Sequence, residues 1–485
     1  MELTTGGVGT NNFTITASGN NSAGIYVNGG TADNLGTIIS NGNGSSGIYA
    51  ASGNAYNQTA VDVTGDGSVG MTASSGNAVN GKTVTTTTED EDGNPVTNTE
   101  YKPGTITVSG SNAAGMKLAG SGSVLNNKGA SITVSGAGST GIWAAGSGSA
   151  TNEGTIIVSA ADALSSGMKS TSGTATNNAS IKVSGTGALG MHANGGTVVN
   201  AAGGVIDVES DDGIGIYVKS GNGNNLGTIN LTGTGAIGLQ ADGGTATNSG
   251  TLEINGTNMV GMYANGGTVV NAAGGIINFN NGDAAIQVDS GTARNEGTIN
   301  LNAGALPGIL VNGGSGTNSG TINVASSASS AIAMNVTGGT ATNSGTITVD
   351  ASGATAMAAS ESGQATNSRT LTINGVNSIG MSAEDSANAT NNSTITLSGS
   401  GGQGMLASGG TVTNASGGTI TVGGSDSKGM VAASGTAVNS GTITATSSNT
   451  IAMYSDGGTI TNSTGGRINT CLLYTSDAAD DMQCV

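Results

Sequence analysis

Apolar and polar residues alternate in short segments along almost the whole chain. In GTITV (104–108), Ile106 and Val108 would face one way and Thr107 the other. This period of two is typical of a half-buried β-strand rather than of a helix. Two more short alternating segments follow in each repeat, of the types GMxA and GTATN, with Gly, Ser and Asn between them. The pattern predicts three short strands per repeat.

The repeats form one long array. The apolar residue of the GMxA segment recurs at eighteen positions: Ile25, Ile48, Met71, Met116, Ile142, Met168, Met191, Ile216, Leu239, Met262, Ile286, Ile309, Met334, Met357, Met381, Met405, Met430 and Met453. Apart from one interval of 45, successive positions are 23–26 residues apart. We predict an all-β fold, a parallel β-solenoid of about 18 rungs over residues 1–470, because a single repeat has too little apolar surface to fold alone. The methionines of this column are interpreted as adaptable core residues rather than as copper ligands.

An asparagine recurs at the end of the GTATN segment in every repeat. An amide side chain both donates and accepts hydrogen bonds, so stacked copies can bond along the axis. The sequence therefore predicts a structural asparagine ladder, not a ligand site, that includes Asn152, Asn177, Asn200, Asn225, Asn248, Asn271, Asn295, Asn318 and Asn343.

Two segments interrupt the repeat. Residues 81–103 contain Thr-rich alternation on both sides of EDEDGNP, which predicts a projecting β-hairpin with an acidic turn. Because loops on a rigid scaffold often carry binding sites, we consider this insertion a candidate interaction surface, the alternative being a solvated decoration. Its candidate residues are Glu89, Asp90, Glu91, Asp92 and Tyr101. The segment 471–485, which holds both cysteines, resembles translated sequencing adaptor and is expected to be non-native.

A second candidate surface is the outward-facing column of the GMxA strand. It contains Tyr26, Tyr49, Trp143, Tyr217 and Tyr263. Aromatic rings on a rigid strand face can stack on sugars or anchor a partner, although an ordinary exposed strand face is the alternative. The only histidine, His192, falls in the same column and is expected to be a surface residue.

Composition and charge exclude several functions. The chain has 89 Gly, 11 Lys and Arg, and a formal net charge of -18. It has no basic stripe, so we expect no nucleic-acid partner. The acidic residues are scattered, the densest group within the repeats being DVESDDG (207–213). We therefore expect no metal, no cofactor and no catalytic residues.

Repeats of the type NSGTIxVxGxxxxGMxAxGGTATN, without cysteine and poor in aromatics, resemble the passenger domains of bacterial autotransporters over residues 11–470. The resemblance implies a right-handed parallel β-helix that acts as a structural and adhesive rod, often in virulence. It also implies a bacterial protein that is anchored at the outer membrane or secreted. A host-cell surface or an extracellular glycan or protein receptor is the expected partner. An outer-membrane β-barrel translocator is expected too, but neither it nor a signal peptide is in this sequence, so both ends are interpreted as truncated.

Two alternatives remain open at this point. Thr-x-Thr pairs at 174/176, 245/247, 340/342, 411/413 and 459/461 suggest a secreted protein that binds ice or another crystalline surface, but TVV and TAR segments interrupt that array. The second alternative is a β-helical enzyme that acts on polysaccharides. Thermal hysteresis would distinguish the ice-binding function from adhesion.

Overall fold

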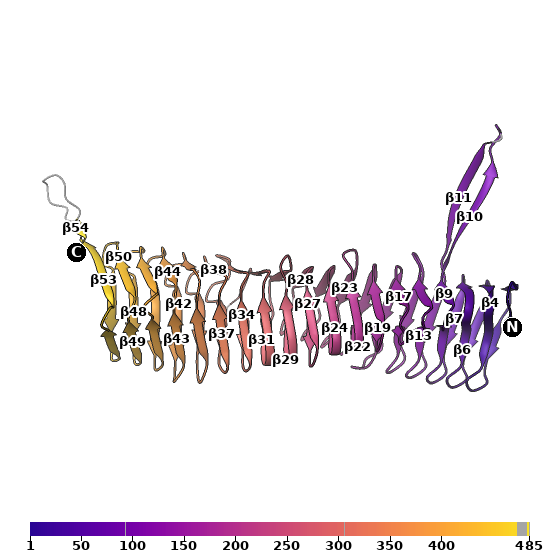
Figure 1. Cartoon of the computed structure of the whole chain (residues 1–485), viewed down its shortest axis with the longest axis horizontal. Helices are drawn as coiled ribbons and strands as arrows, with labels where there is room; N and C mark the ends of the chain where they lie inside the picture. The colour runs from indigo at the N-terminus through magenta and orange to yellow at the C-terminus, as the bar shows by residue number, and fades with distance from the viewer. Residues whose placement is uncertain (93, 305, 473–482, 485) are drawn as a thin grey trace. The chain divides into compact units, whose positions relative to one another are not determined.

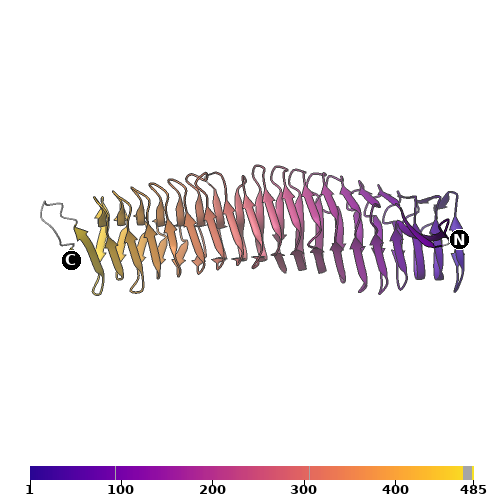
Figure 2. The same cartoon turned by 90° about the horizontal axis from the view of Figure 1, so that it is seen from above.

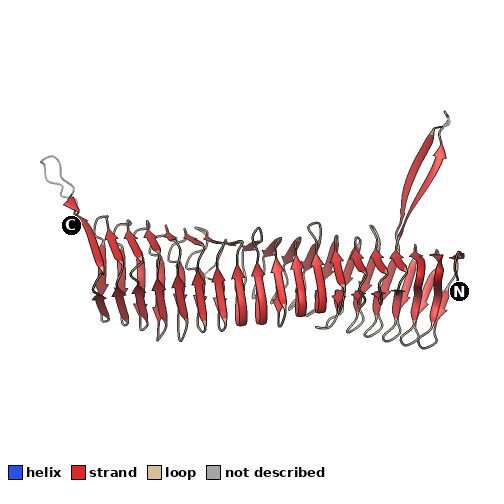
Figure 3. Ribbon diagram, in the orientation of Figure 1, coloured by secondary structure: helices blue, strands red, loops and turns tan. Residues whose placement is uncertain are grey.

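The computed structural model describes residues 1–92, 94–304, 306–472 and 483–484. The chain divides into two compact units, Met1–Gly250 and Thr251–Val485, and each is described by itself. In the described residues every regular element is a β-strand (Figure 3). None of these residues lies in a helix of the length and hydropathy needed to span a membrane.

Each turn has three strand positions, which we call first, second and third. In one turn these are β12 (Thr105–Val108), β13 (Ala114–Leu118) and β14 (Ser123–Asn126). Each strand pairs in parallel and in register with the equivalent strands of the adjacent turns. Figures 1 and 2 show the resulting stack of strands within each unit. The pairing confirms the predicted right-handed parallel β-helix, with about 19 turns rather than about 18. Counting from Ile25 overlooked the first turn, which begins with β1 (Glu2–Leu3) and β2 (Val8–Asn11).

The first unit contains nine first-position strands, β3 (Ile15–Ala17), β5 (Thr37–Ser40), β7 (Ala60–Val63), β12, β15 (Ser131–Val134), β18 (Thr155–Val158), β21 (Ser180–Val183), β23 (Val205–Val208) and β25 (Thr228–Leu231). The separate second-position strands are β1, β8 (Val69–Ala73), β13, β16 (Thr140–Ala144), β19 (Ser166–Ser170) and β26 (Ile237–Ala241). The separate third-position strands are β2, β9 (Asn77–Asn80), β14, β17 (Ser149–Asn152), β20 (Thr174–Asn177) and β27 (Thr245–Asn248). Continuous strands occupy both positions in β4 (Ala23–Asn34), β6 (Ser46–Asn57), β22 (Leu189–Asn200) and β24 (Ile214–Asn225).

The second unit follows the same plan. Its first-position strands are β28 (Thr251–Ile254), β30 (Ile276–Phe279), β32 (Thr298–Leu301), β35 (Thr321–Val324), β38 (Thr346–Val349), β41 (Leu371–Ile373), β44 (Thr394–Leu397), β47 (Thr419–Val422), β50 (Thr442–Ala445) and β53 (Arg467–Leu472). Second-position strands are β33 (Pro307–Val311), β36 (Ile332–Val336), β39 (Thr355–Ala359), β42 (Ile379–Glu384), β45 (Gln403–Ser408), β48 (Lys428–Ala432) and β51 (Ile451–Ser455). Third-position strands are β34 (Ser315–Asn318), β37 (Thr340–Asn343), β40 (Gln364–Asn367), β43 (Asn388–Asn391), β46 (Thr411–Asn414), β49 (Thr436–Asn439) and β52 (Thr459–Asn462). The continuous strands are β29 (Val260–Asn271) and β31 (Ala284–Asn295), and β54 (Gln483–Cys484) pairs with the end of β53.

In the turns with a continuous strand, the chain bends without leaving the sheet. Gly195 in β22 has a φ of 115°, a backbone conformation that favours glycine. The pairing of β22 with β24 shifts register on either side of Asn194, next to this glycine. A glycine between two alternating segments therefore marks a bend within one strand in these turns, where the sequence predicts two separate strands.

The core lies between the three sheet faces of each turn and is built from stacked apolar columns. In β12 the burial alternates as predicted, with Ile106 and Val108 buried and Thr107 exposed. Met71, Met116 and Met168 of the second-position column are fully buried. Stacking identical turns thus joins small apolar clusters into one continuous core in each unit.

Candidate binding surface

The asparagine column at the end of the third position is an internal ladder in each unit. In the first unit, the Nδ2 atom of each asparagine donates to the Oδ1 atom of the next at 2.7–2.8 Å, from Asn11 through Asn34, Asn57, Asn80, Asn126, Asn152, Asn177, Asn200 and Asn225 to Asn248. In the second unit, the same bond at 2.7–2.9 Å joins Asn271, Asn295, Asn318, Asn343, Asn367, Asn391, Asn414, Asn439 and Asn462. All but the end members Asn11 and Asn462 are fully buried. Their amide groups hydrogen-bond to one another and to carbonyl groups of the turns, so the ladder has a structural role.

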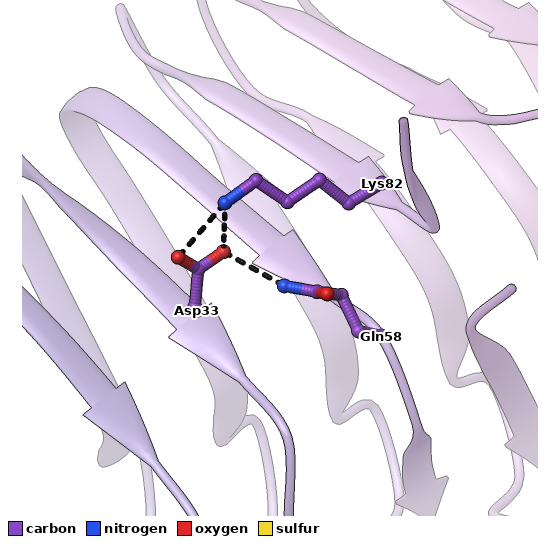
Figure 4. Close-up of polar contacts among 3 residues, drawn as sticks. All are labelled: Asp33, Gln58 and Lys82. Carbon is purple, nitrogen blue, oxygen red and sulfur yellow. Dashed lines mark hydrogen bonds and ion pairs between the residues drawn. The ribbon is translucent and has the colours of Figure 1, made fainter. Parts of the chain in front are cut away.

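The insertion at 81–103 forms an antiparallel hairpin that leaves the first unit between β9 and β12 (Figure 1). Its strands are β10 (Lys82–Glu89) and β11 (Pro95–Lys102). At its base, the Lys82 Nζ atom contacts Asp33 Oδ1 at 2.6 Å and Oδ2 at 2.8 Å (Figure 4). Gln58 Nε2 donates to the same carboxylate at 2.9 Å, and Lys82 Nζ lies 4.7 Å from the Tyr56 ring centroid. These contacts anchor the base of the hairpin to the outward face of the third-position strands.

The acidic tip of the hairpin is fully solvated. Glu89, Asp90, Glu91 and Asp92 are all exposed. Asp90 Oδ1 accepts hydrogen bonds from the backbone N–H groups of Asn94 at 2.8 Å and Asp92 at 3.0 Å, and chiefly the Asn94 bond lowers the pKa of Asp90. The Asp90 carboxylate therefore stabilises the turn in which it lies.

Tyr101 lies near the other end of the hairpin. It is 49% exposed, with the Lys128 Nζ atom 5.6 Å from its ring centroid. The structure therefore places Tyr101 near the hairpin base and away from the acidic turn, so the insertion offers two separate surfaces.

In the first unit, the outward column of the second position contains a stacked tyrosine pair and a tryptophan flanked by lysines. Tyr26 and Tyr49 stack with ring centroids 5.6 Å apart and planes at 11°. Trp143 is flanked by two lysines, with Lys117 Nζ at 4.3 Å and Lys169 Nζ at 5.6 Å from its ring centroid. Tyr26 and Tyr49 thus contact each other and Trp143 contacts two lysines, so the ammonium groups beside Trp143 are part of this surface.

Tyr217 and Tyr263 occur in a repeated three-residue arrangement, one in each unit. Tyr217 donates its hydroxyl proton to Asp242 Oδ2 at 2.7 Å, and Gln240 Nε2 donates to Asp242 Oδ1 at 2.8 Å. Burial, together with this carboxylate, raises the pKa of Tyr217 to about 12.

The matching contacts in the second unit join Tyr263 to Asp289 at 2.6 Å and Gln287 to Asp289 at 3.0 Å. The pKa of Asp289 is lowered by these two hydrogen bonds and one from Asn312, which outweigh the opposing effect of burial. Both tyrosine hydroxyls are therefore tied to the scaffold.

The expectation that His192 is a surface residue is wrong. His192 is only 6% exposed, and its ring centroid lies 5.2 Å from that of Tyr217. Burial, with the charges of Lys169 and Lys219, lowers its pKa from 6.5 to about 4. The outward column is covered at this point by the longer side chains of adjacent turns, which the alternation of one strand does not reveal.

This burial predicts a pH dependence. The unfolded chain binds a proton at His192 near pH 6.5, whereas the folded chain does so near pH 4. The stability contributed by neutral His192 is therefore fully present above pH 6.5 and is lost as the pH falls through about 4, on the order of 3 kcal/mol in total. Unfolding should be compared for the wild type and His192→Gln at pH 7 and pH 4.5. The wild type should lose more stability than the variant, and an equal loss would contradict the burial.

Lys169 and Lys219 belong to this surface and were missed in the sequence. Lys169 pairs in register between Trp143 and His192, so counting along the column would have found it. Lys219 follows the alternating segment of β24, next to the register shift in the β22–β24 pairing, where no periodic signal exists. Reasoning from period alone finds column members but not residues at bulges.

The described residues contain no group of three or more His, Cys, Asp or Glu that could hold a metal ion. Comparison with curated proteins and with solved structures gives no match. A family model, the BigA third pectate lyase-like domain, matches three overlapping or successive segments, 102–221, 162–275 and 312–466. These segments cover more than half of the chain and consist of the stacked turns described above. The chain therefore belongs to the family of the BigA third pectate lyase-like domain.

Proposed function

We propose that this chain is a structural and adhesive scaffold displayed on a bacterial cell surface, the passenger region of an autotransporter-like protein, with no catalytic role. Its fold and family fit a surface-exposed, adhesin-like β-helix. The observation that carries the proposal is the anchored hairpin: a ladder-stabilised backbone holds a projecting, polar binding element in a fixed place through Lys82 and Asp33 (Figure 4).

The proposal is tested by measuring whether bacteria that display the chain attach to host cells or glycans. Bacteria that display the chain through a fused translocator should attach to host cells or immobilised glycans more than bacteria with the translocator alone. Replacing 83–101 by a two-residue turn, or combining Trp143→Ala with Tyr217→Ala, should reduce attachment.

Tyr454→Ala is the matched control, because Tyr454 belongs to the outward column of the second unit and is 38% exposed. Surface amount is measured by antibody for every strain. If bacteria that display a normal amount of the chain attach no better than bacteria with the translocator alone, the adhesive role is ruled out.

One specific observation favours a second candidate, binding to ice or another crystalline surface. The Thr-x-Thr pairs noted in the sequence at 340/342 and 411/413 lie at the third position, but an uninterrupted array lies at the first position of the second unit. Its members lie in five neighbouring turns: Thr346/Thr348, Thr372, Thr394/Thr396, Thr419/Thr421 and Thr442/Thr444. Thr370 directly precedes β41 (Leu371–Ile373) and lies outside the strand. Threonine is also an ordinary residue of exposed strands.

A measurement of thermal hysteresis tests the ice-binding function. Ice binding predicts a measurable gap between melting and freezing points that Thr396→Lys abolishes and Thr107→Lys, at the first position of the other unit, leaves intact. A solution of the chain without hysteresis would eliminate ice binding and leave adhesion.

A further inference from the structure

Lys117, Trp143, Lys169, His192 and Lys219 form what we call the lysine–tryptophan row. The first four occupy one outward column on β13, β16, β19 and β22, with each residue in register with the next. Lys219 follows on β24, the strand paired with β22. The row thus crosses five successive turns on one face of the first unit.

The row concentrates positive charge, and its three lysines form no ion pair within the described residues. Among the described residues, Lys82, Lys102 and Lys182 form ion pairs with carboxylates, whereas Lys117, Lys169 and Lys219 form none. Burial and the nearby charge of Lys219 lower the pKa of Lys169. An anion placed here would relieve both the repulsion and the desolvation.

The net negative charge of the chain does not cancel this local field. The chain carries a formal charge of -18, but at physiological ionic strength charges farther away than about 8 Å are largely screened. In the turn after β24, Asp242 follows Ala241, the residue paired with Val218, so Asp242 lies beside Lys219. Its carboxylate accepts hydrogen bonds from Tyr217 and Gln240. Near Lys117 and Lys169, a ligand anion therefore meets ammonium groups that form no ion pair in the part of the chain that the structure describes.

His192 supplies an independent sign of a missing partner. Only 6% of its surface is exposed, and neither ring nitrogen has a hydrogen-bond partner among the described residues. Buried polar atoms nearly always have a partner, because leaving one unsatisfied costs about 1–3 kcal/mol. Neutral imidazole still carries one N–H donor, which an oxygen of a ligand in contact with the ring would satisfy.

The spacing selects an extended ligand. Lys117 and Lys169 are two turns apart in one column, and two strand spacings amount to about 9.6 Å. Lys219 is also two turns from Lys169, but it lies two residues along β24 from Tyr217, the column residue of its turn. A compact anion can reach one or two of these groups, whereas a polymer with regularly spaced acidic groups can reach all three. Trp143 and Tyr217, which lie among these lysines, also offer apolar surface to a sugar ring.

We propose that the lysine–tryptophan row binds an acidic polysaccharide, whose carboxylate or sulfate groups pair with Lys117, Lys169 and Lys219. This inference rests on the proposed adhesive function and names its ligand class. Binding is electrostatic in large part and weakens as salt is added.

The single tryptophan of the chain lies in the row, so its fluorescence reports binding directly. The purified chain is titrated with a polyuronate and a sulfated polysaccharide, and in parallel with neutral dextran, polyglutamate and inorganic sulfate. We expect a saturable change with at least one acidic polysaccharide, and at least tenfold weaker binding in Lys169→Gln/Lys219→Gln. Lys182→Gln is the matched control, because Lys182 lies on a first-position strand of the same unit and pairs with Glu209 at 2.8 Å. Circular dichroism confirms that all variants are folded.

A comparison of the polyuronate with the sulfated polysaccharide shows whether the ligand is carboxylated or sulfated. No response to either acidic polysaccharide, an equal loss in Lys182→Gln, or equally tight binding of polyglutamate, dextran or sulfate would overturn the proposal. Attachment of displaying bacteria is measured separately with Lys169→Gln/Lys219→Gln. If those bacteria attach normally and the purified chain binds no acidic polysaccharide, the row is not the binding site and the adhesive function stands.

Discussion

Asn343→Asp should destabilise the second unit by about 3–5 kcal/mol at pH 7, the range for an uncompensated buried charge. Asn343 is fully buried, accepts a hydrogen bond from Asn318 at 2.8 Å and donates one to Asn367 at 2.9 Å. A carboxylate can still accept from Asn318, but it loses the donor and sets its charge against the Asn367 Oδ1 atom. The break would interrupt the ladder in the middle of the unit.

The effect should depend on pH. Burial raises the pKa of the new carboxyl group above the unfolded value of about 3.9. The stability that its protonated form contributes is fully present below that unfolded value and is lost as the pH rises through the folded pKa, so the deficit grows with pH.

Denaturant unfolding followed by circular dichroism at pH 7 and pH 4 measures both effects. Asn392→Asp is the control, because Asn392 is exposed two turns away and the change of charge is the same. That variant should stay within about 0.5 kcal/mol of the wild type. Equal behaviour of the two variants would show that the ladder contributes no stability.

Phe279→Ala should have the next largest effect, a loss of about 3–5 kcal/mol. Phe279 is fully buried at the end of β30, in register with Ile254 and Leu301 of the adjacent turns. A Cβ atom at Gly282 would lie 2.9 Å from Phe279 Cε2, so the ring occupies space that a side chain at 282 would need. Alanine would leave a cavity there that the stacked turns cannot close.

The chain contains one other phenylalanine, which provides a matched control. Phe13 is 81% exposed, so Phe13→Ala should change the free energy of unfolding by less than about 0.5 kcal/mol. Phe279→Leu should recover most of the lost stability, because leucine already occupies the same position in the next turn as Leu301. A small effect of Phe279→Ala in denaturant unfolding would contradict the packing of this core.

The fold follows from the sequence because each turn repeats the same physical pattern. The alternation of Ile106, Thr107 and Val108 defines a half-buried strand, and the recurrence of that strand every 23–26 residues defines a solenoid. Handedness came from the resemblance alone, since alternation is the same in either hand. The bends at glycines such as Gly195 depend on backbone angles that the apolar pattern does not encode.

The candidate surface was only partly predictable. The column of Tyr26, Tyr49 and Trp143 follows from the period, and Lys169 would have followed from the same count. The burial of His192 and the position of Lys219 depend on side chains from neighbouring turns and on a bulge. Such contacts are set by tertiary packing, which the pattern of a single strand does not specify.

Adhesion without catalysis is the central claim, and one incubation tests it most directly. The purified chain is mixed with a polyuronate or a sulfated polysaccharide, and retention on the immobilised polymer and the length of the free polymer are measured together. We predict that the chain is retained and that the polymer keeps its length after prolonged incubation. Progressive shortening of the polymer would contradict this account and show that the β-helix is an enzyme.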